Sequence, residues 1–152
     1  MFALLLALLI GDQNSYADSF RESEWTLVGR TDVSEIFVRL GSETSDGHAA
    51  WLRYELMEPQ TRGDFNVASL IAAITVRCSD SHLRTGPATY FTEPKSAGRR
   101  MGTSREGQWQ PTDPASVEGR ATSMVCSGQA GPVFDTIPGR LVPPPPVIIP
   151  IG

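Results

Sequence analysis

Apolar and alternating runs along the middle of the chain predict an antiparallel β-sheet. The stretch 35–40 (EIFVRL) is rich in β-branched and aromatic residues, and in 50–57 (AWLRYELM) one alternate set of positions is mostly apolar. Residues 66–78 are the most apolar part of this region, and their β-branched C-terminal half favours a central strand. Shorter runs at 25–28 and 89–92 bring the expected sheet to about five to six strands.

Glycine, proline and polar clusters separate these runs. Residues 41–47 (GSETSDG) are expected to form a turn, and Glu58-Pro59 is expected to end the third strand. Gly86-Pro87 is expected to break the chain before the run at 89–92. Residues 95–107 hold three glycines and three arginines, and we expect an exposed hairpin tip or a long loop there.

The last regular element is predicted to be one amphipathic helix. Ser116 is a suitable N-cap, and Glu118 adds negative charge to the first turn. Gly119 lowers helix stability by up to about 1 kcal/mol relative to alanine, and the helix is expected to end near Cys126. The apolar positions that define its buried face are Val117, Ala121, Met124 and Val125.

The N-terminal residues have the pattern of a secretory leader. Phe2–Ile10 is a run of nine apolar residues, too short to span a bilayer, and small residues follow at Ser15 and Ala17. We expect residues 1–17 to be a signal peptide cleaved after Ala17, although no basic residue precedes the run. A buried N-terminal strand or helix is the alternative. No cysteine lies near Ala17, which argues against a lipid anchor.

Residues 128–152 combine a Gly/Pro-rich linker with a prolyl tail, and residues 18–127 remain as one domain. Pro143–Pro146 fix an extended polyproline II backbone and remove four hydrogen-bond donors. The tail either stays loose or lies back over an apolar groove of the domain. The other interpretation is a docking peptide for a partner.

Composition narrows the classes of function. The chain has 152 residues and a net charge of −4, so it lacks the basic footprint of nucleic-acid binding. A hydrophobic share of 40% excludes a wholly disordered chain, and no apolar run is long enough for a transmembrane span. Phosphate-binding and dinucleotide-binding motifs are absent from the sequence, and we expect no cofactor.

The two cysteines most simply form one disulfide, Cys78–Cys126, in an exported chain. It would join the end of the most apolar strand to the end of the helix. Closing a loop of this length lowers the conformational entropy of the unfolded chain and so stabilises the fold by about 4 kcal/mol. A redox-active or nucleophilic cysteine is the alternative, but there is no Cys-x-x-Cys pair.

Candidate catalytic groups are few, and we expect no enzymatic activity. His48 lies in a polar turn, and His82 follows Cys78 by four residues, which is half a metal site only if the cysteine is reduced. Ser116 is near Asp113, but helix capping explains it better than a hydrolase triad. We therefore expect no metal site, and an uncharacterised periplasmic enzyme is the alternative.

The densest basic cluster is the candidate binding patch. Its members are Lys95, Arg99, Arg100 and Arg105. Such a patch could hold an anionic polymer or the acidic face of a partner, and the alternative is a solvated loop tip. Trp51 and Trp109 are interpreted as core or turn anchors rather than ligand platforms.

The domain resembles the surface-adhesin protein E family over about residues 25–126. Trp25, Ile36–Val38 and Trp51 fit its N-terminal half loosely. In departure from the family pattern, Ala115 replaces a glycine and Arg39 stands where an aspartate often occurs. The more specific motifs are Cys78, Arg84, Tyr90, Gly98, the turn Trp109-x-Pro111-x-x-Pro114-Ala115-Ser116, and the closing Val125-Cys126.

This resemblance implies an α+β fold, with the C-terminal helix packed across the antiparallel sheet, the disulfide and an envelope setting. Named members bind host matrix and plasma proteins, but no such segment can be matched here residue by residue. We expect an exported, non-enzymatic protein- or surface-binding module that is periplasmic, secreted or on the outer surface. Its expected partners are extracellular or envelope proteins. An envelope assembly factor that docks through the prolyl tail is a further alternative.

Overall fold

The computed structural model describes residues 22–103 and 105–128. The predicted signal peptide and all but the first residue of the predicted linker and tail lie outside these residues. The described elements are η1 (Glu22–Glu24), β1 (Thr26–Arg30), β2 (Ser34–Thr44), β3 (Gly47–Arg62), β4 (Phe65–Arg77), β5 (His82–Glu93), η2 (Pro94–Ser96), β6 (Ala97–Thr103), β7 (Gln110–Pro111) and α1 (Val117–Ser127).

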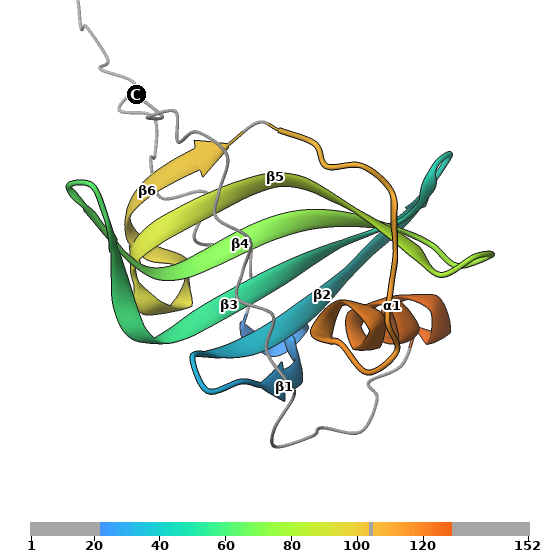
Figure 1. Ribbon diagram of the computed structural model, residues 1–152, viewed down its shortest axis with the longest axis horizontal. Coiled ribbons are helices and arrows are strands. Elements are labelled where there is room, and N and C mark those ends of the chain that lie inside the picture. Colours follow the sequence, from blue (N-terminus) through green and yellow to red (C-terminus); the bar gives the residue numbers. More distant parts are fainter. Residues whose placement is uncertain (1–21, 104, 129–152) are drawn as a thin grey trace, which may run out of the picture.

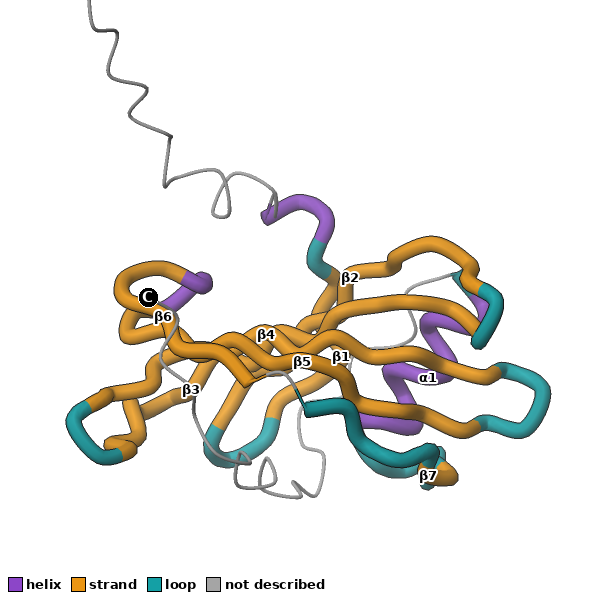
Figure 2. The backbone as a smooth tube through the Cα atoms, turned by 90° about the horizontal axis from the view of Figure 1, so that it is seen from above, coloured by secondary structure: helices purple, strands orange, loops and turns teal. Residues whose placement is uncertain are grey.

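The strands form a single antiparallel meander in the order β1-β2-β3-β4-β5-β6 (Figure 1). The two-residue strand β7 pairs with the start of β5, before the part of β5 that pairs with β6. The predicted antiparallel sheet with one C-terminal helix is therefore confirmed. α1 packs on one face of the sheet, and Trp25, which directly follows η1, packs on the other. Figure 2 shows η1 standing clear of the strands.

Several predicted strand ends are wrong because irregular pairing accommodates the breaking residues. β3 continues through Pro59 to Arg62, and its register with β4 shifts between Glu55 and Gln60, so proline is not required to donate to the ladder. β5 likewise runs through Gly86-Pro87, opposite a register shift in β4. The turn expected at 41–47 is shorter, because β2 extends to Thr44.

One face of the sheet, the helix face, packs against α1. The predicted apolar side of α1 is buried, and Ala121 is completely enclosed. Alternate positions of the strands supply the other half of this core, as the two-residue period of a strand requires. The cluster contains Val28, Ile36, Val38, Ala50, Leu52, Ile74, Val76, Leu83, Val117, Ala121, Met124 and Val125.

A second cluster, which we call the tyrosine cluster, adjoins the first on the helix face. Tyr54 packs against both clusters, and none of the residues of the tyrosine cluster comes from α1. The cluster consists of Phe65, Val67, Leu70 and Tyr90, with Tyr54, Leu56, Ala72, Ala88 and Met101 packed against them.

The opposite side of the sheet, the far face, carries a third cluster. Trp25, Ile71 and Phe91 are buried there, and Phe37 and Trp51 pack against them. Trp25 follows η1 directly, so the chain enters the domain on the far face and leaves it through α1 on the helix face.

Candidate functional site

The candidate binding patch lies on the last hairpin of the meander. Lys95 is in the turn η2, Arg99 and Arg100 are in β6, and Arg105 follows the strand. All four residues are exposed. Residues 95–107, predicted as a hairpin tip or a long loop, are in fact a tight turn, a strand and then a short loop. We call β5, η2 and β6 together the basic hairpin.

The turn of the basic hairpin is held by side chains of the far face. Lys95 and Ser96 both have positive φ angles, 56° and 60°, which are uncommon outside glycine. The Lys95 N–H donates to both carboxylate oxygens of Glu55, at 3.1 and 2.9 Å. The Ser96 N–H donates to the Ser69 hydroxyl at 3.0 Å, and that hydroxyl donates to the Glu93 carbonyl at 2.7 Å. These bonds fix the backbone that presents Lys95.

Arg99 and Arg100 project to opposite faces of the sheet, because neighbouring side chains of a strand alternate. The Arg99 guanidinium lies 5.7 Å from the centre of the Phe65 ring, at the edge of the tyrosine cluster. Arg100 stands on the other side and is in register with Phe91. The basic hairpin therefore has positive charge along both faces of β6 rather than one flat patch.

Arg105 is separated from the turn by the length of β6. Seven strand residues extend over about 20 Å. The segment after β6 is tied back to β5 by the Gly107 N–H, which donates to the Thr85 carbonyl at 2.7 Å. The structure therefore brings Lys95, Arg99 and Arg100 to one hairpin and places Arg105 beyond it.

A buried arginine supports the basic hairpin from the far face. Arg53 is only 2% exposed, and its guanidinium lies 4.8 Å from the centres of both the Trp25 and Phe37 rings. It donates to both carboxylate oxygens of Glu22 at 2.8 Å, and its Nε forms an ion pair with Glu55 Oε1 at 3.0 Å. This bidentate, stacked geometry suits arginine and not lysine.

The two carboxylates around Arg53 respond in opposite ways. The Arg53 hydrogen bonds lower the pKa of Glu22, whose side chain is 55% exposed. Burial raises the pKa of Glu55, despite the Lys95 N–H and the Arg53 charge, which both act to lower it. Glu55 thus links the buried cation to the turn of the basic hairpin. This network could not be read from the apolar alternation of 50–57, because Arg53 belongs to the other set of alternate positions.

Trp109 is an anchor between two arginines. Its ring centre lies 4.7 Å from the Arg77 guanidinium carbon and 5.0 Å from that of Arg84. Arg77 also forms a close ion pair with Asp80, at 2.6 Å. The tryptophan therefore joins the segment before α1 to the ends of β4 and β5.

The residues after Trp109 set the start of α1. Pro111 is in register with His82, and the turn containing Pro114 follows. The Ser116 hydroxyl accepts the Gly119 N–H at 3.0 Å, which is the N-cap that the sequence places there. A Cβ on Gly119 would lie only 1.9 Å from the Asp113 carbonyl oxygen. Glycine is therefore required at this position by a close backbone approach, whatever it costs the helix.

The predicted disulfide Cys78–Cys126 is present and confirmed, with its Cα atoms 5.6 Å apart. It joins the residue after β4 to the last turn of α1. Because Cys78 is bonded, its thiol is not available to form a metal site with His82.

The other groups considered for chemistry are dispersed. His82 Nδ1 lies 2.9 Å from the Asp80 carbonyl oxygen, and His48 lies on β3. Among the described residues, no three His, Cys, Asp or Glu side chains are grouped as metal ligands would be. No described helix is long and apolar enough to cross a membrane.

Comparisons with known proteins agree with this architecture. The model of the family described as surface-adhesin protein E matches residues 25–127. The solved structure of Haemophilus influenzae protein E is similar at a TM-score of 0.51 and 11% sequence identity, covering 72% of this chain and 88% of that one. At this identity the likeness concerns the fold. Comparison with curated protein sequences finds no match. Because the family model covers most of the domain, the chain belongs to the surface-adhesin protein E family.

Proposed function

We propose that this protein is an exported, non-enzymatic binding module that holds an acidic protein partner on its basic hairpin. Family membership supports a surface or exported adhesin-like envelope protein. The basic hairpin as the binding surface and an acidic segment as the partner go beyond what the family implies. The observation that carries it is the exposure of Lys95, Arg99 and Arg100 on one hairpin whose turn is fixed by Glu55 and Ser69.

The position of β6 supports binding to an extended acidic segment. β6 is the last strand of the meander, and among the described strands it pairs with β5 alone. An edge strand can accept a further strand from a partner, whereas arginine side chains on it oppose pairing with another basic edge. An acidic partner strand satisfies both conditions, because its carboxylates can meet guanidinium groups on either face of β6.

The binding test uses residues 18–152 and an immobilised peptide of alternating glutamate and valine. We expect K95S/R99S/R100S to reduce the affinity at least about tenfold, since three charge-assisted contacts are lost. Binding should also weaken with rising ionic strength. Unchanged affinity in the triple variant would exclude the basic hairpin as the site.

Single substitutions separate the hairpin from general charge. Arg100→Ser and Arg105→Ser each remove one exposed arginine, but only Arg100 lies on β6. Arg100→Ser is expected to weaken binding about threefold, while Arg105→Ser leaves it nearly unchanged. Equal losses would indicate a diffuse electrostatic attraction without a defined surface.

Export is tested separately by fractionating cells that carry the full chain. The proposal expects the protein outside the cytoplasm, with Asp18 as the first residue of the mature form and with Cys78 and Cys126 oxidised. Recovery from the cytoplasm with residues 1–17 intact would contradict export without affecting the binding measurement.

A further inference from the structure

We propose that the tyrosine cluster is a binding site for an apolar polyproline segment, and that its occupant is the chain's own C-terminal segment, residues 141–152. This site is separate from the role proposed for the basic hairpin. Two features of the cluster and two of the chain outside the described residues support it.

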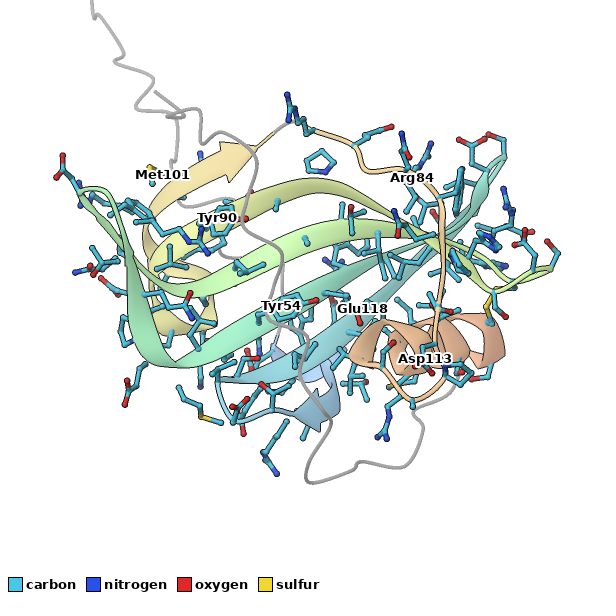
Figure 3. The ribbon with its side chains drawn as sticks, in the orientation of Figure 1. Tyr54, Arg84, Tyr90, Met101, Asp113 and Glu118 are labelled. Atoms are coloured by element: carbon cyan, nitrogen blue, oxygen red, sulfur yellow. A yellow bond between two sulfur atoms is a disulfide. The ribbon has the colours of Figure 1, made fainter. Side chains whose placement is uncertain are left out.

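The first feature is the place of the cluster beside α1. The helix covers the neighbouring core, and it contributes no residue to the tyrosine cluster. Tyr54, Leu56 and Met101 are partly exposed there. Figure 3 shows Tyr54 near Glu118 at the start of α1, with Tyr90 and Met101 farther toward β6. The four central residues of the cluster are buried, with Tyr90 only 4% exposed, so the accessible apolar surface is formed by the partly exposed side chains packed against them.

The second feature is a pair of phenolic donors. Burial raises the pKa of the Tyr54 hydroxyl, and nearby Glu118 and Tyr90 add to the effect. Burial also raises the pKa of Tyr90. Both groups therefore stay protonated and can donate. Within the described residues, neither phenol is hydrogen-bonded to a protein group. Neither oxygen is among the fully buried polar atoms that lack a partner there, so water reaches both hydroxyls.

The chemistry of the C-terminal segment matches these features. Residues 141–152 read LVPPPPVIIPIG, with no charged side chain. A polyproline II backbone makes no internal hydrogen bonds, so its carbonyl oxygens are open to donors such as Tyr54 and Tyr90. Its proline and valine side chains suit the apolar surface around Met101. Aromatic-lined surfaces recognise prolyl segments in this way because the ligand is already extended and loses little entropy.

The length of the chain permits the contact in cis. α1 is 11 residues long, or about 16 Å, and Glu118 beside Tyr54 places the cluster near its first turn. The 12 residues 128–139 can extend over about 40 Å, which is more than enough to return along the helix. A tether of this length gives an effective concentration of about 1 mM. If the segment has an intrinsic Kd of about 0.1 mM, chains with their own segment bound would outnumber chains with it unbound by about ten to one.

The test uses the full mature chain and a synthetic peptide of residues 141–152. In one variant, all four residues Pro143–Pro146 are changed to serine, which leaves the folded domain unaltered. Binding is followed through the NMR signal of the Met101 methyl group and by titration calorimetry. We expect the serine variant to shift the Met101 signal and to bind the added peptide. The wild-type chain should bind the same peptide at least about tenfold less tightly, because its own segment competes.

Matched substitutions locate the site. Met101→Glu should abolish peptide binding by the serine variant, whereas Met57→Glu, at a 52% exposed methionine outside the cluster, should not change it. The assignment is overturned if the serine variant does not bind the peptide, or if wild-type chain and variant bind it equally. It is also overturned if Met101 reports contact with a second copy in a concentration-dependent dimer of both proteins.

Discussion

Replacing Arg53 with methionine tests the support of the basic hairpin at its centre. The substitution keeps an unbranched, apolar side chain between Trp25 and Phe37 but removes the charge and all donors. Arg53 is 3% exposed at its side chain, while its partners Glu22 and Glu55 are 55% and 14% exposed. The variant therefore leaves one carboxylate that can regain water and one that largely cannot.

The expected loss follows from this difference in exposure. Removing one member of a buried ion pair costs about 3–5 kcal/mol, chiefly because the partner stays buried without compensation. Glu22 recovers hydration, which places the loss at the lower end, and the two lost cation–π stacks each add about 0.5–1 kcal/mol. Methionine recovers part of the packing. We expect Arg53→Met to lower the free energy of unfolding by about 3 kcal/mol.

Urea unfolding at neutral pH with the disulfide intact measures this loss. With an m-value of about 2 kcal/mol/M, the midpoint should fall by about 1.5 M. Arg30→Met is the matched control, because Arg30 pairs with Glu35 at 2.6 Å but its side chain is 44% exposed. The control should change stability by less than about 1 kcal/mol. Equal stability of the two variants would refute the account of Arg53 as a compensated buried charge.

Three further outcomes are expected. Gly119→Ala should destabilise the protein by about 1–3 kcal/mol in thermal unfolding, because the alanine Cβ would overlap the Asp113 carbonyl. This loss should outweigh the higher helix propensity of alanine. A stabilised variant would contradict the close approach. Changing Cys78 and Cys126 to serine should cost about 4 kcal/mol in urea unfolding, and a loss below about 1 kcal/mol would show that the bridge adds little. Glu55 binds its proton more tightly when folded, so it contributes stability below the pKa of 4.5 that is lost as the pH rises through its raised folded value. In wild type, the free energy of unfolding should therefore fall as the pH rises above 4.5, and Glu55→Gln should remove that fall. The lowered pKa of Glu22 makes the free energy of unfolding rise with pH only below 4.5. An unchanged pH profile in the Gln variant would refute this assignment.

The sequence predicts the strands that have a clear apolar pattern and the helix that has a cap. In 50–57 one alternate set of positions is mostly apolar, so the inward face of that strand could be assigned before the fold was known, while 35–40 was identified by its β-branched and aromatic residues. β6 reads AGRRMGT and has no such pattern. It is a strand because it pairs with β5 and because Ser69 and Glu55 hold the turn before it. Tertiary contacts of this kind override local propensity.

The network around Arg53 could not be predicted from the sequence for a related reason. A charged residue at an alternate strand position ordinarily faces water. Here its partner Glu22 comes from 31 residues earlier, in a short turn placed on the far face by Trp25. The sequence shows that the basic residues are close along the chain, but it does not show that they lie on different faces and at different ends of β6. The two-residue period separates Arg99 from Arg100, and the length of β6 separates both from Arg105.

Site-specific photocrosslinking in cells tests the central claim most directly. A benzophenone side chain is placed at Arg100 on β6, or at Glu43 on the exposed β2–β3 hairpin as the matched control. We predict a crosslink to an extracellular or envelope protein from position 100, which is lost when K95S and R99S are also present, and none from position 43. Crosslinking from position 43 alone, or equal crosslinking from both, would contradict binding through the basic hairpin.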